Sequence, residues 1–192
     1  MAKMKFNGFV DSIRGSVGGL VVRKGRRGKY TLSNKPDFTE LTPSEAQAAQ
    51  RKVFGQAVDY GKSVMADPDK LAFYKGLAEQ KDMPAFSLCV ADYLNPPSMD
   101  DLDLSAYEGK VGDSILITTH DDIGVVRVNV ELTRTDGTNI EKGQAVELGI
   151  GNWAYIATVP VAAGTDIFIE ANAFDRPGSK TVCSANPTVG MN

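Results

Sequence analysis

The feature that most constrains this chain is a succession of short strand patterns between residues 114 and 173. Each run is rich in β-branched and aromatic residues, and Asp-Gly, Gly-Asn or Pro-Gly turn signals lie between or beyond the runs. Short strands at regular spacing, divided by turn signals, are typical of an antiparallel β-sandwich. The four runs are Ser114–Thr119, Val125–Leu132, Trp153–Val159 and Asp166–Ala173.

Alternate residues of a strand point to the same face of its sheet, so each run should present one apolar row to a core between two sheets. Side chains that fill such a core are poor candidates for a binding site. We expect the sandwich core to contain Val126, Val128, Val130, Trp153, Tyr155, Ile167 and Ile169.

Residues 39–96 carry helical patterns. Thr42-Pro43-Ser44-Glu45 combines a capping residue, a proline at the first helical position and an early glutamate, which predicts a helix start. Asp67-Pro68 repeats this signal, and Pro84 can open a third segment that ends before Asn95-Pro96-Pro97. The first helix should bury a face whose apolar residues recur at spacings of three and four, namely Ala46, Ala49, Val53, Ala57, Tyr60 and Val64.

The first 38 residues are rich in glycine and cations. Two short strands, within 18–24 and 28–33, are predicted around the turn at 25–28. An isolated two-stranded hairpin is marginal in water, so this arm should require a surface to lie on. We therefore predict a multidomain α+β chain with three parts: a basic extended arm or β-hairpin (1–38), a short helical segment (39–96) and an antiparallel β-sandwich (97–192).

The formal net charge of −3 conceals an uneven distribution. Residues 1–36 hold nine Lys or Arg and one acid, whereas residues 100–192 hold six Lys or Arg and fourteen acids. A basic arm on an acidic body can reach nucleic acid, or the acidic body of a neighbouring copy. No apolar run approaches the ~20 residues of a membrane span, and the N-terminus lacks the apolar stretch of a signal peptide.

The basic arm admits three interpretations. Its cations would neutralise phosphates of nucleic acid, with Tyr30 as a stacking ring; alternatively, its alternating apolar residues would add strands to the exposed sheet edge of a neighbouring copy. The third is a solvated tail, or a hairpin docked on the chain's own helices. The strand-like alternation favours assembly. The candidate phosphate or acidic-partner contacts are Arg14, Arg23, Lys24, Arg26, Arg27 and Lys29, and the candidate assembly residues are Leu20, Val21, Val22, Tyr30 and Leu32.

Residues suited to catalysis or metal binding are sparse. The single histidine, His120, has no accompanying nucleophile motif such as G-x-S-x-G. With Cys89 and Cys183, two distant residues expected to be free packing thiols, it does not form a zinc site. The glycine-rich segments Gly15–Gly19 and Gly25–Lys29 lack the G-x-x-x-x-G-K-[ST] spacing of a phosphate-binding loop. We expect no enzyme activity, cofactor, metal or small-molecule substrate. Ca²⁺ remains an open alternative, because aspartates expected at strand ends offer oxygen ligands, although aspartate also forms turns: Asp100, Asp101, Asp103, Asp121, Asp122 and Asp175.

Three segments, Asp121–Val128, Trp153–Thr158 and Ile169–Gly178, resemble bacterial immunoglobulin-like domains found in surface proteins and phage virion proteins. This resemblance implies an immunoglobulin-like sandwich and no particular ligand, because that fold hosts unrelated tasks. The N-terminal half is similar to uncharacterised proteins of Bacteroidetes-type genomes and their phages, on Arg23–Pro36 and Ser44–Arg51. The second resemblance implies a phage or mobile-element particle.

These observations together predict a non-enzymatic structural subunit of a phage or phage-like particle, or of a fibre or filament, that self-associates through its N-terminal arm. Its partners would be further copies or other particle subunits, and it would lie in the virion, or in the cytoplasm before assembly. Two alternatives stay open. One is a nucleic-acid-associated protein that uses the arm. The other is a surface adhesion module that binds glycan or protein through sandwich loops such as 136–139 and 149–152.

Overall fold

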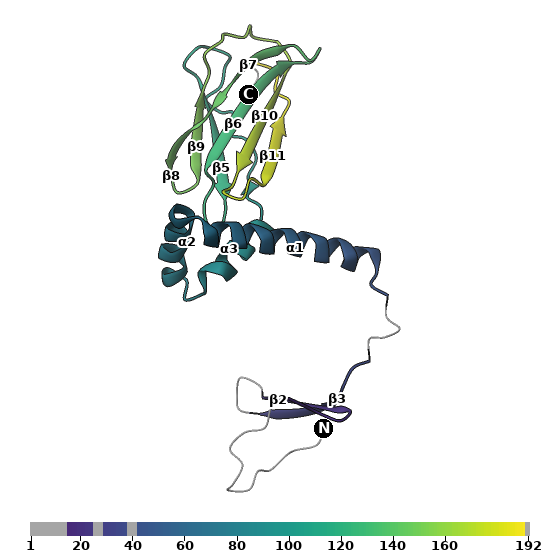
Figure 1. The fold of residues 1–192 in the computed structure, drawn as a ribbon. Coiled ribbons are helices and arrows are strands. Elements are labelled where there is room, and N and C mark those ends of the chain that lie inside the picture. Colours follow the sequence, from purple (N-terminus) through teal and green to yellow (C-terminus); the bar gives the residue numbers. More distant parts are fainter. Residues whose placement is uncertain (1–14, 25–28, 38–41, 191–192) are drawn as a thin grey trace. The chain divides into compact units, whose positions relative to one another are not determined.

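The chain folds as two units, Met1–Gln47 and Ala48–Asn192, in the computed structural model. The structure describes residues 15–24, 29–37 and 42–190. These residues form three helices and three antiparallel sheets (Figure 1). The predicted mixture of helices and antiparallel sheets is therefore confirmed. The boundaries expected at residues 38 and 96 remain predictions.

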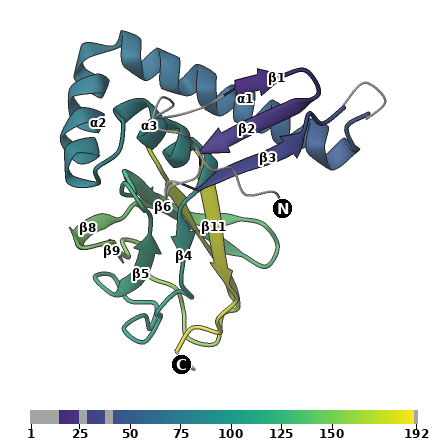
Figure 2. The same cartoon turned by 90° about the horizontal axis from the view of Figure 1, so that it is seen from below.

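The first unit contains a three-stranded antiparallel sheet, in the order β1-β2-β3 (Figure 2). The two strands predicted around residues 25–28 are present as β2 and β3, and β1 adds a third that the sequence did not predict. Val22 lies opposite Leu32, and Lys24 lies opposite Tyr30. The strands are β1 (Gly15–Val17), β2 (Leu20–Lys24) and β3 (Tyr30–Asn34).

Three helices follow in the chain: α1 (Glu45–Ala66), α2 (Pro68–Gln80) and α3 (Ala85–Leu94). The first begins later than the predicted Pro43, because Ser44 and Gln47 cap it reciprocally. The Gln47 amide donates to Ser44 Oγ, and the Ser44 amide donates to Gln47 Oε1. The predicted start of the second helix is confirmed, since the Asp67 side chain accepts from the amides of Asp69 and Lys70.

Only part of the buried face expected on α1 is buried. Ala57 and Val64 are buried as predicted, whereas Ala46, Ala49 and Val53 are exposed. The prediction is wrong for these three because α2 and α3 lie beside the C-terminal part of α1, and its N-terminal part projects beyond them (Figure 1). Apolar residues at spacings of three and four show which side chains share a face of a helix, but not how far along the helix other elements cover that face.

Residues 98–185 contain two four-stranded antiparallel sheets, in the orders β11-β10-β6-β7 and β4-β5-β9-β8. Residue Ala145 lies between β7 and β8, where the chain passes from one sheet to the other, and it is buried. The strands are β4 (Ser98–Met99), β5 (Ser114–His120), β6 (Arg127–Arg134), β7 (Asn139–Gln144), β8 (Val146–Gly149), β9 (Asn152–Ile156), β10 (Ile167–Phe174) and β11 (Lys180–Ala185).

Both four-stranded sheets contribute to one hydrophobic core. Of the seven residues predicted for it, six are buried: Val128, Val130, Trp153, Tyr155, Ile167 and Ile169. The prediction is wrong for Val126, whose side chain is 44% exposed. Strand β6 begins only at Arg127, so Val126 lies in the preceding loop, although its amide still donates to the Phe174 carbonyl.

The helices and one end of the sandwich belong to the same unit. The Lys81 ammonium donates to the carbonyl of Asp122 at 2.9 Å, and Ile123 packs against the helical core. Both described cysteines are free: Cys89 is buried in the helical core and Cys183 is half-buried on β11. Burial raises the pKa of the Cys89 thiol to about 11, which makes it a packing residue rather than a reactive thiol.

Candidate functional site

The predicted assembly residues of the arm divide between the two faces of the N-terminal sheet. Strand pairing places Val22 and Leu32 on one face, with Leu20 and Tyr30 on the same side by alternation, whereas Val21 lies on the other. Val22 is buried, and it is the one buried side chain described within residues 15–24 and 29–37. The structure therefore brings four of the five residues together.

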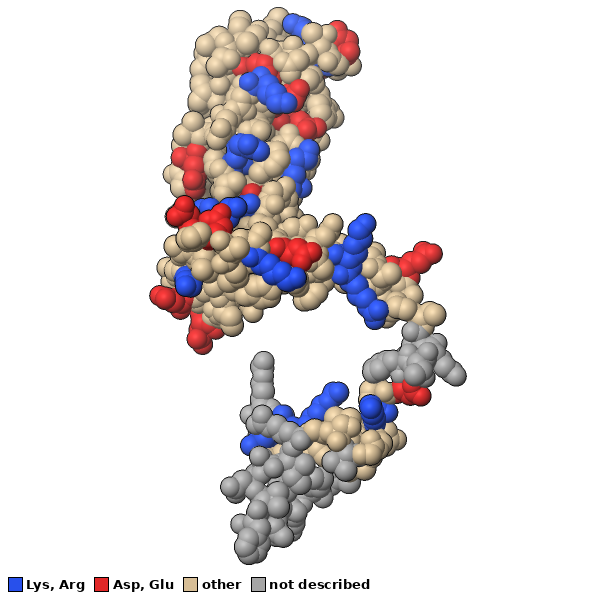
Figure 3. Space-filling model, viewed as in Figure 1, with Lys and Arg blue, Asp and Glu red and all other residues tan. Residues whose placement is uncertain are grey.

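The predicted cationic residues are described only in part. Arg23, Lys24 and Lys29 are exposed, and the Lys24 ammonium lies 5.6 Å from the centroid of the Tyr30 ring. In Figure 3, blue side chains lie along the described part of this sheet, and both charges are mixed over the helices and the sandwich. The remaining predicted contacts, Arg14, Arg26 and Arg27, lie outside the described residues.

Three of the six aspartates proposed for Ca²⁺ hold turns, namely Asp103, Asp121 and Asp175. Asp121 Oδ1 accepts from the amides of Ile123 and Gly124, at 2.7 and 2.6 Å, and Asp175 Oδ1 accepts from the amides of Gly178 and Ser179. Within the described part of the chain, no three or more His, Cys, Asp or Glu side chains are placed to hold a metal ion together. Asp121 and Asp175 therefore act as turn formers in this structure.

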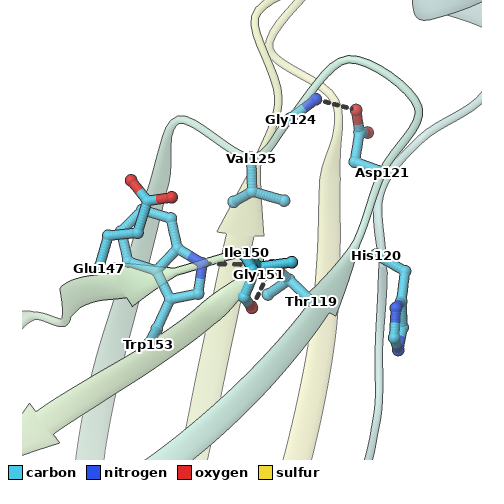
Figure 4. A pocket seen from close by; sticks show the side chains of 9 residues that line it. All are labelled: Thr119, His120, Asp121, Gly124, Val125, Glu147, Ile150, Gly151 and Trp153. Atoms are coloured by element: carbon cyan, nitrogen blue, oxygen red, sulfur yellow. Dashed lines mark hydrogen bonds between the residues drawn. The ribbon is translucent and has the colours of Figure 1, made fainter.

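A pocket of about 360 Å³ opens beside the end of β5 (Figure 4). Its inner wall is Trp153, whose indole donates to Thr119 Oγ1 at 3.2 Å, while the Thr119 hydroxyl donates to the Gly151 carbonyl at 2.9 Å. His120 lies at the rim with its ring pointing away from Trp153, and its Nε2 lies 3.1 Å from both carboxylate oxygens of Asp100. The Thr119 hydroxyl is thus engaged in holding the pocket wall and is a poor nucleophile.

A buried carboxylate lies between the helices and the sandwich, and sequence reasoning missed it. The Tyr60 hydroxyl is hydrogen-bonded to Tyr74, and Tyr74 donates to Asp92. Burial raises the pKa of Asp92 to about 6, and the nearby charges of Asp121 and Asp175 act in the same direction. The signal in the sequence was an aspartate within the apolar run of residues 85–94.

Strand β8 is an outer strand with an exposed apolar row, which sequence reasoning also missed. Val146 and Leu148 are 64% and 63% exposed. Val146 lies opposite Ala154 of β9, and Ala154 lies opposite Leu116 of β5, so the apolar row continues across the outer face of the sheet. The signal in the sequence was the alternation Val-x-Leu-x-Ile over residues 146–150.

The row ends at the tip of the β8–β9 hairpin, where the two-residue loop is Ile150-Gly151 (Figure 4). Both residues have positive φ, 51° and 75°, as the central residues of a type I′ turn do. A β-branched residue is unfavourable in this conformation, and Ile150 is 99% exposed, so it gains no burial in exchange. Isoleucine is therefore strained at this position without the burial that would offset the strain in the single chain.

No family model, curated protein or solved structure matches this chain. Of the helices that the structure describes, none has the length and apolarity needed to cross a bilayer.

Proposed function

We propose that this chain is a non-enzymatic structural subunit that self-associates through its N-terminal sheet. The observation that carries the proposal is the sparse burial in that sheet: three strands of three to five residues contain one buried side chain, Val22, among those described. So little apolar burial does not offset the entropy of ordering the strands. A neighbouring subunit would supply the missing surface.

Charge supports the same proposal. The exposed cations of the sheet, Arg23, Lys24 and Lys29, belong to a segment with eight excess positive charges, and residues 100–192 carry eight excess negative charges. Opposite charges on the two ends of identical chains favour contact between copies and accelerate encounter.

The kind of assembly is part of the proposal. Two four-stranded antiparallel sheets around one core that contains Trp153 are compatible with an immunoglobulin-like sandwich. Together with the resemblances of the two halves, this leads us to propose a component of a phage-like particle or fibre, located in the virion.

A second candidate is binding to nucleic acid. It is favoured by one observation, the ammonium of Lys24 beside the ring of Tyr30, which presents a cation and a stacking surface together. Phosphate binding weakens steeply with salt, whereas strand pairing between apolar faces persists, so ionic strength separates the two functions.

The test is light scattering on the full chain and on a chain that begins at Thr42, at low and at high salt. We expect the full chain to form a species larger than a monomer that persists at high salt, and the shortened chain to be monomeric. A full-length Leu32→Asp variant should also be monomeric. It controls for the effect of shortening the chain, because it changes one side chain of the N-terminal sheet and keeps every other residue. Monomeric full chain at every concentration would overturn the proposal.

A further inference from the structure

We propose that the free edge of strand β8 is the acceptor for strand β3 of a second copy. This inference rests on the self-association proposed above and deepens it, because it names the surface that receives the arm. Strand addition to an exposed sheet edge takes its affinity from main-chain hydrogen bonds and its specificity from alternate side chains.

The described sheets differ in how their outer strands are protected. An unpaired strand edge is a template for pairing, and proteins usually blunt it with charge or by keeping it short. Strand β7 carries Lys142, which pairs with Glu131 at 2.7 Å, β11 carries Lys180, and β4 has two residues. Strand β8 has four residues, carries Glu147 and has a register shift before Gly149, but it pairs with β9 on one side only and leaves Val146 and Leu148 64% and 63% exposed.

The occupant is identified by matching the two faces of β8 with those of β3. On β8, Val146 lies opposite Ala154 and Glu147 lies opposite the buried Trp153, so these two side chains point to opposite sides. Leu148, at the register shift between Glu147 and Gly149, is 63% exposed. On β3, Tyr30 and Leu32 share the apolar face of the arm sheet. Alternation places Thr31 and Ser33 on the opposite face of β3, and the exposed Lys29 and Lys35 directly precede and follow the strand in the same odd-numbered series.

Pairing β3 with β8 therefore continues the apolar row of Val146 and Leu148 into Tyr30 and Leu32. It also brings the lysines that flank β3 to the side occupied by Glu147. The match of Val146 and Glu147 with the two faces of β3 holds for either strand direction, because neighbouring residues of a regular strand point to opposite faces.

Glu147 also argues against the simplest competing occupant, the β8 edge of another copy. Two β8 strands paired edge to edge would bring two Glu147 carboxylates to the same side, where like charges repel. The Glu147 carboxylate therefore disfavours pairing of two β8 strands and favours pairing of β8 with a strand flanked by lysines.

Ile150 extends the apolar row beyond the end of β8. Its complete exposure in a strained turn is explained if it covers the apolar face of the incoming arm sheet, where Leu20 is also exposed. The strain would then be offset in the assembly and not in the single chain.

The test uses full-length chains throughout, with one acceptor variant, one donor variant and one matched control. Leu148→Lys disables the acceptor edge, and Leu32→Asp disables the donor strand. Val111→Lys is the control, because Val111 is 62% exposed, like Leu148, but lies in a loop distant in sequence from β8. Each variant is measured by light scattering and analytical ultracentrifugation, and its fold is checked by circular dichroism.

We expect Leu148→Lys and Leu32→Asp each to raise the dissociation constant of self-association by more than about tenfold, and Val111→Lys to leave it unchanged. Mixing the two disabled chains should restore a one-to-one complex that stops at two chains, because one contributes an intact β3 and the other an intact β8. Glu147→Lys should weaken association, and a partner chain with Lys29→Glu and Lys35→Glu should restore it.

The outcomes separate the two proposals. If the wild-type chain assembles and Leu32→Asp abolishes assembly, but Leu148→Lys assembles like wild type, the arm binds elsewhere and the β8 acceptor is overturned. If both variants are monomeric and their mixture stays monomeric, pairing of β3 with β8 between copies is overturned. A monomeric wild-type chain would overturn self-association itself.

Discussion

The guanidinium carbon of Arg176, in the loop after β10, lies 3.5 Å from the centroid of the Phe73 ring in α2. This cation–π contact joins the helices to the end of the sandwich. Arg176 also lies close enough to Asp92 to oppose the elevation of its pKa. One exposed arginine therefore supports both the packing and the charge balance of this junction.

Replacement of Arg176 by alanine should lower the free energy of unfolding by about 1 kcal/mol, the usual contribution of a cation–π pair at a partly exposed site. A double-mutant cycle with Phe73→Leu, followed by urea unfolding, isolates the pair from other losses. Arg134→Ala, at an exposed arginine on β6, is the control and should have little effect. Additive single and double variants would show that the two side chains are not coupled.

Asp92 should make stability fall as pH rises. Its folded pKa of about 6 lies above the ordinary unfolded value near 3.9, so the folded chain holds the proton more tightly. The stability that Asp92 contributes is fully present below about pH 4 and is lost as pH rises through about 6, on the order of 2–3 kcal/mol in all.

Asp92→Asn provides the measurement. The variant should match wild type near pH 4 and exceed it in unfolding free energy at pH 8, because no charge is then buried. Subtracting the two urea-unfolding series removes the contribution of other carboxylates, such as Asp113 and Asp136, whose lowered pKa makes stability depend on pH with the opposite sign. A constant difference between pH 4 and pH 8 would contradict this prediction.

Ile150→Asn should stabilise the single chain and weaken its self-association. Asparagine tolerates the left-handed conformation that isoleucine adopts here at φ 51°, so unfolding should cost about 1 kcal/mol more. Ile150→Val keeps the β-branched strain and should give no such gain. A thermal melt and a sedimentation series on the same samples measure both effects, and a loss of stability in the asparagine variant would refute the assignment of strain.

Gly151 and Gly137 are a matched pair for separating backbone strain from steric collision. Both have positive φ, 75° and 84°. A Cβ at Gly151 would collide with the carbonyl oxygen of Thr119, whereas a Cβ at Gly137 would meet open space. Alanine should therefore cost about 1 kcal/mol at Gly137 and about 3 kcal/mol or more at Gly151, as measured by urea unfolding. Equal costs would show that the hairpin tip relaxes away from Thr119.

Much of the fold was predictable because its signals are local. The residues Asp67 and Pro68 specify a helix start through a hydrogen-bonding side chain and a fixed φ, and both act within one turn. Strand alternation likewise placed Val128, Val130, Ile167 and Ile169 in the core. Strands β7 and β11 were missed because short runs rich in polar residues acquire their structure from the strands beside them. Strand β8 was missed although its alternation is visible, because it has only four residues.

The sequence by itself determined the elements with strong local patterns, the uneven charge and the apolar and cationic faces of the arm. Tertiary structure alone decided which side chains of these elements are covered by other parts of the chain. Val53 and Val126 carry the pattern of buried residues and are exposed, while Asp92 carries a charge and is buried. The same holds for β8, whose alternation is visible in the sequence but whose free edge is not. Coverage and edges depend on contacts between segments far apart in the chain, and no local pattern encodes those contacts.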